Sequence, residues 1–290
     1  MPVPTYAVRM SVPLSFDACQ AGRELSEPRI SPDGGRVVFV ASESSVSGSV
    51  VRLVSRGIDG GSETVWSDVP VRSARGLNGG VVEWMPDGSS VLAITREGDL
   101  RRFGLDGRDA LVLPGGGASL SSPMPSPDGR HVAVVIDQSE IRVIDVETAR
   151  TRRVDRGDHD FVFDPVWWRG EPLWHAWRVP HMPWDESSLV SPRGVLVGSA
   201  HRQVQQPSPS PDGGRIGWLD DASGWLNLVL DDGRRVSEAA EHGGPTWGER
   251  QRSWCWNPAG DVVAFVRNEG GFGRLCTFDL RTGQVVERAR

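Results

Sequence analysis

Short runs of β-branched and apolar residues recur along the chain, and each run follows a tight-turn sequence. Residues 37–40 (VVFV) form such a run, two positions after residues 31–34 (SPDG). Proline fixes φ, aspartate bonds back to the backbone and glycine accepts a positive φ, so this tetrapeptide favours a tight turn. Apolar residues alternate at Leu226, Leu228 and Leu230, and helical periodicity is nearly absent. The pattern predicts short antiparallel strands and a single short helix near residues 15–23.

The turn sequence repeats at a nearly constant interval. Counted from its aspartate position, or from the residue that replaces it (33, 87, 128, 169, 212 and 259), successive copies lie 54, 41, 41, 43 and 47 residues apart. Short antiparallel strands in units of this length form the four-stranded blades of a β-propeller. A pair of β-sandwiches is the alternative, but it would not explain a turn that recurs at blade length. The sequence therefore predicts an all-β fold, a β-propeller.

Six repeat units are recognisable, and their number bears on whether the ring is closed. We expect an N-terminal strand or short-helix segment over residues 1–27, joined to a propeller over residues 28–290. The fold is either six-bladed or of a seven-bladed type with one blade missing. An unclosed ring leaves sheet edges that invite pairing, so the second form predicts self-association. The expected four-stranded units cover residues 28–75, 76–117, 118–157, 158–204, 205–240 and 241–290.

The charge balance and the cysteines limit the classes of partner and compartment. Lys+Arg total 32 against 38 Asp+Glu, a net charge of -6, whereas nucleic acids and anionic membranes require a basic face. All 32 basic residues are arginine, which excludes a lysine Schiff base or P-loop lysine and indicates a GC-rich genome. The three cysteines form no CxxC pair, and no segment reaches the roughly 18 apolar residues of a membrane span. We therefore expect a cytoplasmic, bacterial protein that binds neither nucleic acid nor membranes.

Four longer segments carry a resemblance to a known family. They are residues 25–42 (LSEPRISPDGGRVVFVAS), 175–189 (HAWRVPHMPWDESSL), 223–233 (SGWLNLVLDDG) and 241–275, which includes EHGGPTWGER and RNEGGFGRL. They resemble the N-terminal β-propeller of prolyl-oligopeptidase-family serine peptidases, in the acylaminoacyl-peptidase and dipeptidyl-peptidase-like branch. The Pro-Asp-Gly turns are also shared by TolB-like propellers. The resemblance covers most of the chain.

In that family the propeller gates access to an α/β-hydrolase domain that carries a Ser-Asp-His triad. This sequence contains no G-x-S-x-G nucleophile elbow, so no catalytic residue is carried over. The resemblance implies a non-catalytic binding or gating module without a cofactor, the front part of a split or truncated peptidase. Its expected partners are a separately encoded α/β-hydrolase domain or another protein, and a peptide-like or small-molecule ligand. The alternatives are a metal-dependent hydrolase or lyase with its site in the propeller tunnel, and a TolB-like protein-interaction scaffold.

The segment before and after residue 250 holds the candidate binding residues. Arg250 and Arg252 alternate along the chain and could clamp a carboxylate bidentately, while Glu249 or Glu269 could meet an amino terminus. The alternative is that these charged groups pair with one another across neighbouring blades. The same candidate set includes Trp247, Arg267 and Asn268.

A second candidate element is the loop His181-Met182-Pro183-Trp184-Asp185. Its proline and tryptophan predict a rigid loop with an aromatic tip, of which His181, Trp184 and Asp185 are the candidate binding residues. The loop is either a docking element or a packed connection between strands.

Histidines, tryptophans and cysteines in the second half allow further hypotheses. Asp158-His159-Asp160, with His175, His181 and Asp185 nearby in the sequence, suggests a metal site. No histidine pair has helical i, i+4 spacing, however, so solvated loop histidines and no metal are favoured. Ten of the twelve tryptophans fall within residues 167–256, which predicts packing between blades or, alternatively, an aromatic rim. Cys255 and Cys276 are expected to be buried structural thiols.

Overall fold

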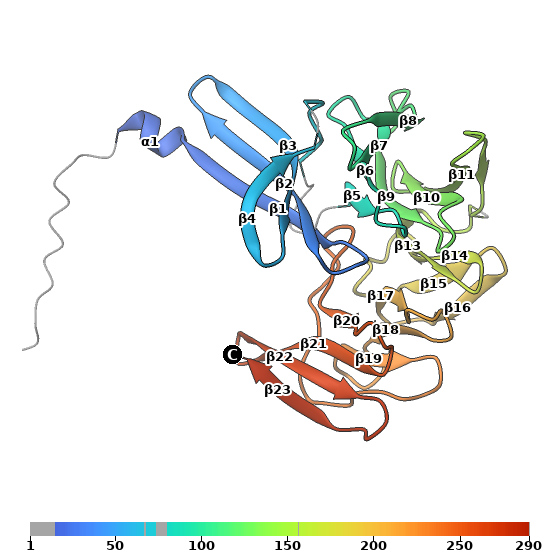
Figure 1. Ribbon diagram of the computed structural model, residues 1–290. Coiled ribbons are helices and arrows are strands. Elements are labelled where there is room, and N and C mark those ends of the chain that lie inside the picture. Colours follow the sequence, from blue (N-terminus) through green and yellow to red (C-terminus); the bar gives the residue numbers. More distant parts are fainter. Residues whose placement is uncertain (1–14, 67, 74–79, 156, 290) are drawn as a thin grey trace, which may run out of the picture.

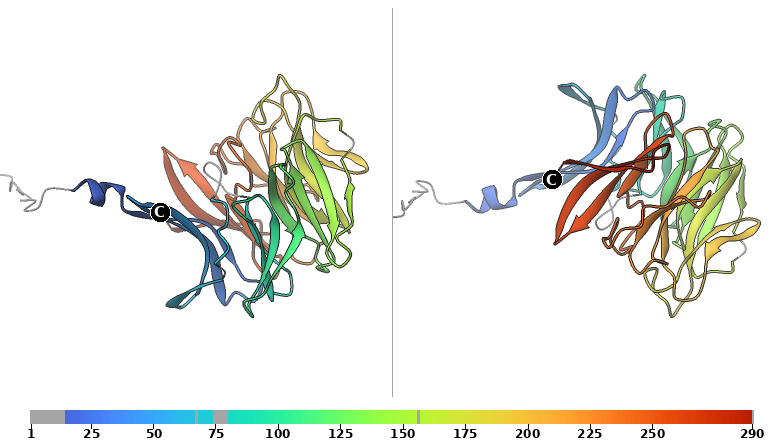
Figure 2. Two further views of the ribbon diagram at one scale, coloured as in Figure 1. Left: turned by 90° about the horizontal axis from the view of Figure 1, so that it is seen from above. Right: turned by 90° about the horizontal axis from the view of Figure 1, so that it is seen from below.

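The computed structural model describes residues 15–66, 68–73, 80–155 and 157–289, and nearly all of its regular structure is strand. Six sheets surround a common centre (Figures 1 and 2), which confirms an all-β propeller. A short helix, α1 (Phe16–Gln20), precedes the first sheet, as the sequence predicts. The first three blades contain β1 (Gly22–Ile30), β2 (Arg36–Ser45), β3 (Gly48–Gly57) and β4 (Gly60–Val65); β5 (Val82–Trp84), β6 (Ser90–Ile94), β7 (Leu100–Gly104) and β8 (Asp109–Leu113); and β9 (Leu120–Pro125), β10 (His131–Ile136), β11 (Glu140–Asp145) and β12 (Thr151–Arg153). The last three contain β13 (Phe161–Trp168), β14 (Glu171–Trp177), β15 (Ser188–Ser191) and β16 (Gly194–Gly198); β17 (Val204–Pro209), β18 (Ile216–Asp220) and β19 (Asn227–Leu230); and β20 (Trp254–Trp256), β21 (Val262–Glu269), β22 (Phe272–Asp279) and β23 (Val285–Ala289).

Each blade is an antiparallel meander whose first strand lies nearest the ring centre. The Pro-Asp-Gly turn joins this strand to the second, as between β1 and β2. These turns therefore lie on one rim, which we call the back rim. The loops that lead into the innermost strands lie on the opposite rim, the front rim. The innermost strand of the first blade starts at Gly22, inside the segment that the sequence places ahead of the propeller.

Apolar side chains fill the space between neighbouring blades, and indole groups add hydrogen bonds there. One buried cluster joins the first blade to the second and third, and another joins the fifth to the sixth. Trp84 Nε1 donates to the carbonyl oxygen of Arg29 in the preceding blade at 2.9 Å. Trp167 and Trp254 donate in the same way to carbonyls of β9 and β17. Packing between blades therefore accounts for much of the tryptophan content, although Trp247 is 65% exposed.

The fifth blade has three strands, not the four that the repeat predicts. After the turn at Gly233 the chain makes a single bridge, from Arg235 to Val229. It then leaves the sheet, and a histidine side chain takes up a backbone donor near the start of β19: the ring Nδ1 of His242 accepts the N–H of Leu228 at 3.1 Å. The residues available for a fourth strand therefore lead along the front rim towards the centre.

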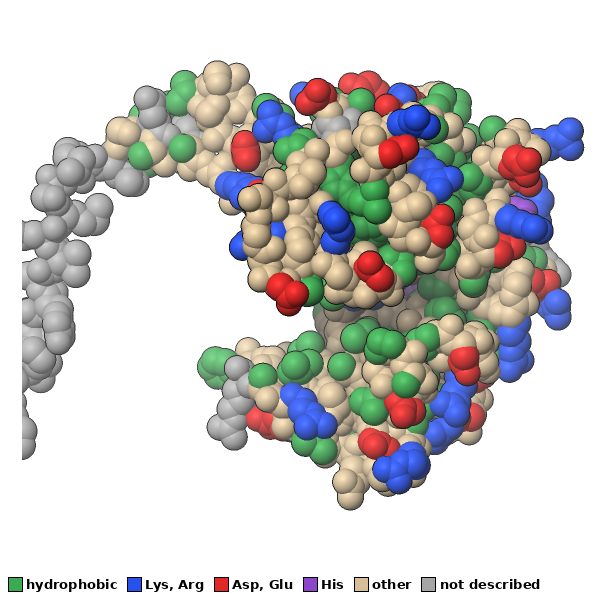
Figure 3. Space-filling model, viewed as in Figure 1, with side chains coloured by type: hydrophobic (Ala, Val, Ile, Leu, Met, Phe, Trp, Pro, Cys, Tyr) green, Lys and Arg blue, Asp and Glu red, His purple; other side chains and the backbone are tan. Residues whose placement is uncertain are grey.

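The first and sixth blades do not meet. Figure 3 shows a deep opening between them, and in the described ranges no strand of β20–β23 shares a sheet or a buried cluster with β1–β4. The sixth blade buries one face against the fifth, and cross-strand register places six residues on its other face. We call this the outer face of the sixth blade: Cys255, Ala264, Val266, Leu275, Thr277 and Val286.

Both sheets that border the opening present apolar side chains to it. On the outer face of the sixth blade, Val266 is 39% and Leu275 is 45% exposed. Hydrophobic side chains gather along the lower edge of the opening in Figure 3. On the first blade, Leu25 and Ile30 are 55% and 62% exposed, on the face that also carries Phe39. The same face of the first blade also holds the buried residues Phe39, Ala41 and Val54, so only part of it lacks the cover that a neighbouring blade normally supplies.

The opening also explains why the expectation for one cysteine is wrong. Cys276 faces the fifth blade and is fully buried, as predicted, whereas Cys255 is exposed. Cys255 pairs with Ala264 on the outer face of the sixth blade, where no further blade covers it.

We expect the outer face to drive self-association. Replacing Leu275 by Arg places a charge on this face, and any interface that buries it must desolvate that charge. The association constant, measured by analytical ultracentrifugation, should fall by about tenfold or more. Leu105→Arg, at an equally exposed leucine in the β7–β8 turn, is the control and should leave association unchanged. Wild-type protein that stays monomeric at all concentrations would contradict the expectation.

Candidate binding site in the central tunnel

The innermost strands share a local distortion next to the tunnel. In each blade one residue there has a positive φ, and five of the six are not glycine, although side chains rarely adopt this conformation. Strand register shifts at four of these places, which marks β-bulges. The six residues are Glu27 (φ 53°), Gly80 (99°), Ser122 (50°), Asp164 (51°), Gln206 (54°) and Arg250 (61°).

The bulge of the first blade supplies a buried carboxylate to the second. The Glu27 side chain is completely buried, and its oxygens accept the backbone N–H groups of Gly80, Val81 and Val82 at 3.0, 2.9 and 3.2 Å. Three amide donors on one carboxylate satisfy its charge in place of water. Glu27 therefore fixes the chain where it enters β5.

The segment that precedes β20 crosses the tunnel and contacts three other blades. The N–H of Arg250 donates to Asp164 Oδ1 of the fourth blade at 2.5 Å, and its guanidinium pairs with Glu83 of the second. Glu249 accepts the hydroxyls of Ser121 and Ser122 of the third blade at 2.7 and 3.1 Å. These contacts tie the last blade to the middle of the ring, and they occupy the two residues at the centre of the predicted binding segment.

Burial perturbs the charged groups of this segment. The pKa of Glu249 is raised to about 7, chiefly because burial disfavours its charge, with the nearby Asp164 adding to the effect. Burial also raises the pKa of Asp164 and lowers that of Arg250 well below its usual value. The Glu249 carboxyl is therefore close to half protonated at neutral pH.

Arg252 differs from the other tunnel arginines. Arg29 lies 3.7 Å from both Glu27 and Glu83, and Arg250 pairs with Glu83. No carboxylate of the described residues lies within 4.0 Å of the Arg252 guanidinium, which donates only to the carbonyl of Gln251 at 3.1 Å. Dense surroundings lower its pKa, yet the residue is exposed. Asp164 is near enough to stabilise the Arg252 charge, but Arg252 remains an exposed cation without a carboxylate in ion-pair contact among the described residues.

The structure brings the two predicted binding elements together on the front rim. The rings of Trp184 and Trp247 lie 4.7 Å apart, and Trp247 is 65% exposed. Asp185 is exposed and accepts the N–H of Met182 at 3.1 Å, so its carboxylate shapes the loop, while His181 is half-buried. Trp247 is separated by one residue from Glu249, which is fixed in the tunnel. The aromatic pair is therefore held at the tunnel mouth.

The remaining predicted site residues lie at the end of β21 and have other partners. Arg267 pairs with Glu269 at 2.7 Å and with Glu238 of the fifth blade at 3.4 Å, while the N–H of Asn268 donates to the carbonyl of Glu241 at 2.8 Å. In the part of the chain that the structure describes, no hydrogen bond or ion pair joins them to Arg250 or Arg252. Arg267 also lies 3.3 Å from Glu287 on β23, so two of its three carboxylate partners among the described residues belong to the sixth blade and one, Glu238, precedes that blade.

Six residues of the tunnel site were missed from the sequence: Glu27, Ser122, Asp164, Glu83, Ser121 and Arg29. The signal for the first two was present, because Glu27 and Ser122 each lie six residues before the aspartate of a turn, as does Gln206. A polar residue that recurs at a constant number of residues before the turn predicts an equivalent position near the propeller axis in each blade. Glu83 and Asp164 lack that spacing.

The expectation that the histidines lie solvated in loops is wrong for His175, which lies on β14. His175 is fully buried, and burial alone lowers its pKa to about 3, so it is neutral. Within the described ranges no three His, Cys, Asp or Glu side chains are grouped to hold a metal ion, and no helix is long and apolar enough to cross a bilayer.

Similar proteins support the fold. No family model matches the chain. A tricorn protease homologue of Saccharolobus solfataricus is 24% identical over 189 residues, which cover 61% of this chain and 17% of that protein. A puromycin-hydrolyzing peptidase of Mycobacterium tuberculosis superposes with a TM-score of 0.71 and 20% identity, over 91% of this chain and 46% of its own. Prolyl oligopeptidase B of Galerina marginata gives 0.62 and 11%, over 92% and 42%. The fold is that of the propellers of prolyl-oligopeptidase-type peptidases.

Propellers of other kinds of protein are also similar. An oligogalacturonate lyase in complex with manganese gives a TM-score of 0.66 at 11% identity, over 93% of this chain and 78% of its own. TolB of Acinetobacter baumannii gives 0.53 at 17% identity, over 93% and 64%. The chain spans less than half the length of the two peptidases and about a sixth of the curated relative. The similarity therefore establishes the fold, and the function depends on the site.

We expect Glu249→Gln to change how stability depends on pH. A carboxyl with a raised folded-state pKa stabilises the protein fully below its unfolded pKa near 4.5, and this contribution is lost as pH rises through about 7. In the wild-type protein this loss amounts to about 3 kcal/mol. The variant shows no such loss, because its amide cannot ionise. The free energy of unfolding is measured by urea titration at pH 5 and pH 8. The difference between the variant and wild type should be more favourable to the variant at pH 8 than at pH 5. Glu171→Gln, at a surface ion pair with Arg193, should show no such trend, and parallel profiles for Glu249→Gln and wild type would refute the expectation.

Proposed function

We propose that the chain is a non-catalytic β-propeller that binds a peptide-like ligand at the front rim and gates its passage into the tunnel. The observation that carries the proposal is Arg252, an exposed arginine beside the tunnel with no carboxylate within 4.0 Å among the described residues. Arginine binds a carboxylate bidentately, and in a narrow site the surrounding protein weakens competition from water. The ligand carboxylate would bind Arg252.

The aromatic pair supports a binding role at the tunnel mouth. Trp247 and Trp184 form an exposed apolar surface, and tryptophan is enriched among residues that dominate binding energy. A ligand that spans the mouth would place its apolar side chains on this pair and its carboxylate on Arg252.

The similarity to peptidase propellers supports the gating part of the proposal. By that analogy the natural setting is a complex with an α/β-hydrolase domain, and peptides are the ligand class. The bacterial, cytoplasmic setting expected from the sequence is part of the same proposal.

A tunnel enzyme is the second candidate, because Glu249 titrates near neutrality as an acid–base catalyst would. Its two oxygens, however, already accept hydroxyls of Ser121 and Ser122, and the residue is 6% exposed. A group enclosed in this way serves the internal anchoring of the segment, so binding is the better-supported role.

Binding should depend on Arg252 and on the charge of the ligand terminus. By calorimetry, N-acetyl-Leu-Ala with a free carboxylate should bind about tenfold more tightly than its C-terminal amide. Arg252→Gln should remove that difference, and Trp247→Ala should weaken both ligands alike. Arg288→Gln, on the outermost strand β23, and Trp225→Ala, at another exposed tryptophan, are the matched controls. Equal affinities for acid and amide in the wild-type protein would refute the carboxylate site.

The purified chain should not hydrolyse peptides. We expect no turnover of acylaminoacyl p-nitroanilides and no labelling by diisopropyl fluorophosphate, because the sequence has no nucleophile elbow. Turnover that disappears on labelling of a serine would contradict the non-catalytic role, whatever the result of the binding experiment.

A further inference from the structure

The outer edge of the fifth blade is closed without a fourth strand. β19 is the last strand of this sheet, and the N–H groups along its outer edge belong to Leu226, Leu228 and Leu230. The N–H of Leu230 donates to the carbonyl oxygen of Arg234 at 2.8 Å, as it would to a neighbouring strand. The other two N–H groups donate to side chains, which therefore replace the carbonyl groups of a fourth strand.

Both of these side-chain acceptors can be protonated. Glu241 Oε2 accepts the N–H of Leu226 at 2.7 Å, and Nδ1 of His242 accepts that of Leu228 at 3.1 Å. A backbone N–H can only donate, and an imidazole nitrogen accepts a hydrogen bond only while it carries no proton. The proton of neutral His242 is therefore on Nε2, which lies 3.1 Å from Glu238 Oε2. These two bonds fix the ring and its tautomer.

The same edge holds the connecting segment, residues 236–242, that follows the fifth blade. The side-chain amide of Asn227 donates to the carbonyl oxygen of Ala240 at 2.9 Å. The backbone N–H of His242 donates to the carbonyl oxygen of Leu226 at 2.8 Å. His242 is thus attached to the edge twice, through its backbone and through its ring.

Burial and charge oppose each other at the His242 ring. The ring is completely buried, and burial is the main reason why its pKa lies below the usual 6.5, with Arg267 of β21 adding to the effect. Glu238 favours the charged ring, but Glu238 also lies 3.4 Å from Arg267. Arg267 pairs in addition with Glu269 and Glu287. His242 is therefore neutral at neutral pH and takes up a proton only in acid.

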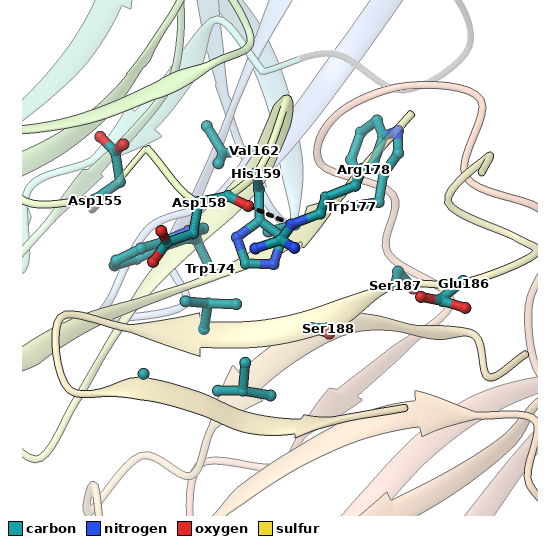
Figure 4. A pocket seen from close by; sticks show the side chains of 14 residues that line it. Asp155, Asp158, His159, Val162, Trp174, Trp177, Arg178, Glu186, Ser187 and Ser188 are labelled. Carbon is teal, nitrogen blue, oxygen red and sulfur yellow. Dashed lines mark hydrogen bonds between the residues drawn. The ribbon is translucent and has the colours of Figure 1, made fainter. Parts of the chain in front are cut away.

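Other histidines lack a bond of this kind. His159 lines the pocket of Figure 4, close to Arg178, and its ring has no hydrogen bond to another described residue. Both ring nitrogens of His175 are buried without a partner. Among the described residues, His242 is the histidine whose ring accepts a backbone N–H.

We propose that His242 is an acid-sensitive clip, which closes the edge of the fifth blade while its ring is neutral and opens that edge when Nδ1 takes up a proton. The new N–H then faces the N–H of Leu228, so the ring turns away from β19 and keeps its bond to Glu238. The connecting segment separates from the edge with it. The Leu228 N–H becomes available to an extended segment of another chain, as at any free sheet edge. The clip does not depend on a ligand at Arg252.

Hydrogen exchange of the Leu228 amide tests the clip directly. Its protection factor, which is corrected for the intrinsic effect of pH on exchange, should fall at least about tenfold as His242 becomes protonated. The ring ¹⁵N resonances of His242 report that protonation on the same sample. The Leu226 amide should follow the Leu228 amide, whereas the Leu230 amide, bonded to a backbone carbonyl, should keep its protection.

His242→Asn separates the hydrogen bond from the titration. The asparagine oxygen takes the place of Nδ1 and can accept the Leu228 N–H, but it has no proton to gain. Protection of the Leu228 amide should therefore stay constant over the pH range in which it falls in wild type. The same substitution at an exposed histidine, His201→Asn, should leave the wild-type behaviour unchanged. If His242→Asn fails to fold, the wild-type titration decides, because ring protonation and loss of Leu228 protection must share one midpoint.

Four results would overturn the clip. The first two are a proton on Nδ1 at neutral pH and a Leu228 amide that stays protected after His242 is protonated. The third is a ring that stays neutral until the whole chain unfolds, which is recognised by loss of protection in β6 and β10. The fourth is a pH dependence that persists in His242→Asn, which would assign the opening to another group such as Glu249.

Discussion

The contacts of Glu249 and Arg250 across the tunnel are the interaction on which the rest of the structure depends. A propeller sheet gains stability by burying both faces against neighbours, and a closed ring achieves this for every blade. Here the first and sixth blades border an opening, and each leaves part of one face exposed. The sixth blade is instead attached to the second, third and fourth through Glu83, Ser121 and Asp164. The three-stranded fifth blade fits this arrangement, because the chain that would form its fourth strand is used to reach the centre.

The same contacts pair most of the charged side chains in the tunnel with one another, whereas Arg252 takes no part in them. Buried carboxylates and guanidinium groups are costly unless they are paired and hydrogen-bonded, and the tunnel residues largely meet that condition through one another. Arg252 lies beyond the crossing segment, where water still has access, and Trp247 lies before it on the rim. Because residues 249 and 250 are fixed, Trp247, which precedes them in the chain, and Arg252, which follows them, are held close to the tunnel as well.

The sequence predicts the fold well because the repeat is local. A Pro-Asp-Gly turn and the strand after it are encoded within about ten residues, and the six copies place the blades. It predicts the site only in part, because pairing between distant residues decides the result. Arg250 and Arg252 have the same side chain and alternate along the chain, yet Arg250 pairs with Glu83, 167 residues earlier, and Arg252 does not. Cys255 and Cys276 both lie on strands of the sixth blade, and the face to which each belongs explains why Cys255 is exposed and Cys276 is buried.

Hydrogen exchange of individual backbone amides tests the central claim most directly. The N–H groups of Val81 and Arg250 donate to the buried carboxylates of Glu27 and Asp164, although neither residue lies within a strand. If the crossing segment holds the open ring together, both amides should exchange only through global unfolding, as slowly as the amides of the central strands β6 and β10. Exchange of the Arg250 amide at the rate of the rim loops would show that the segment opens locally, and would contradict this account.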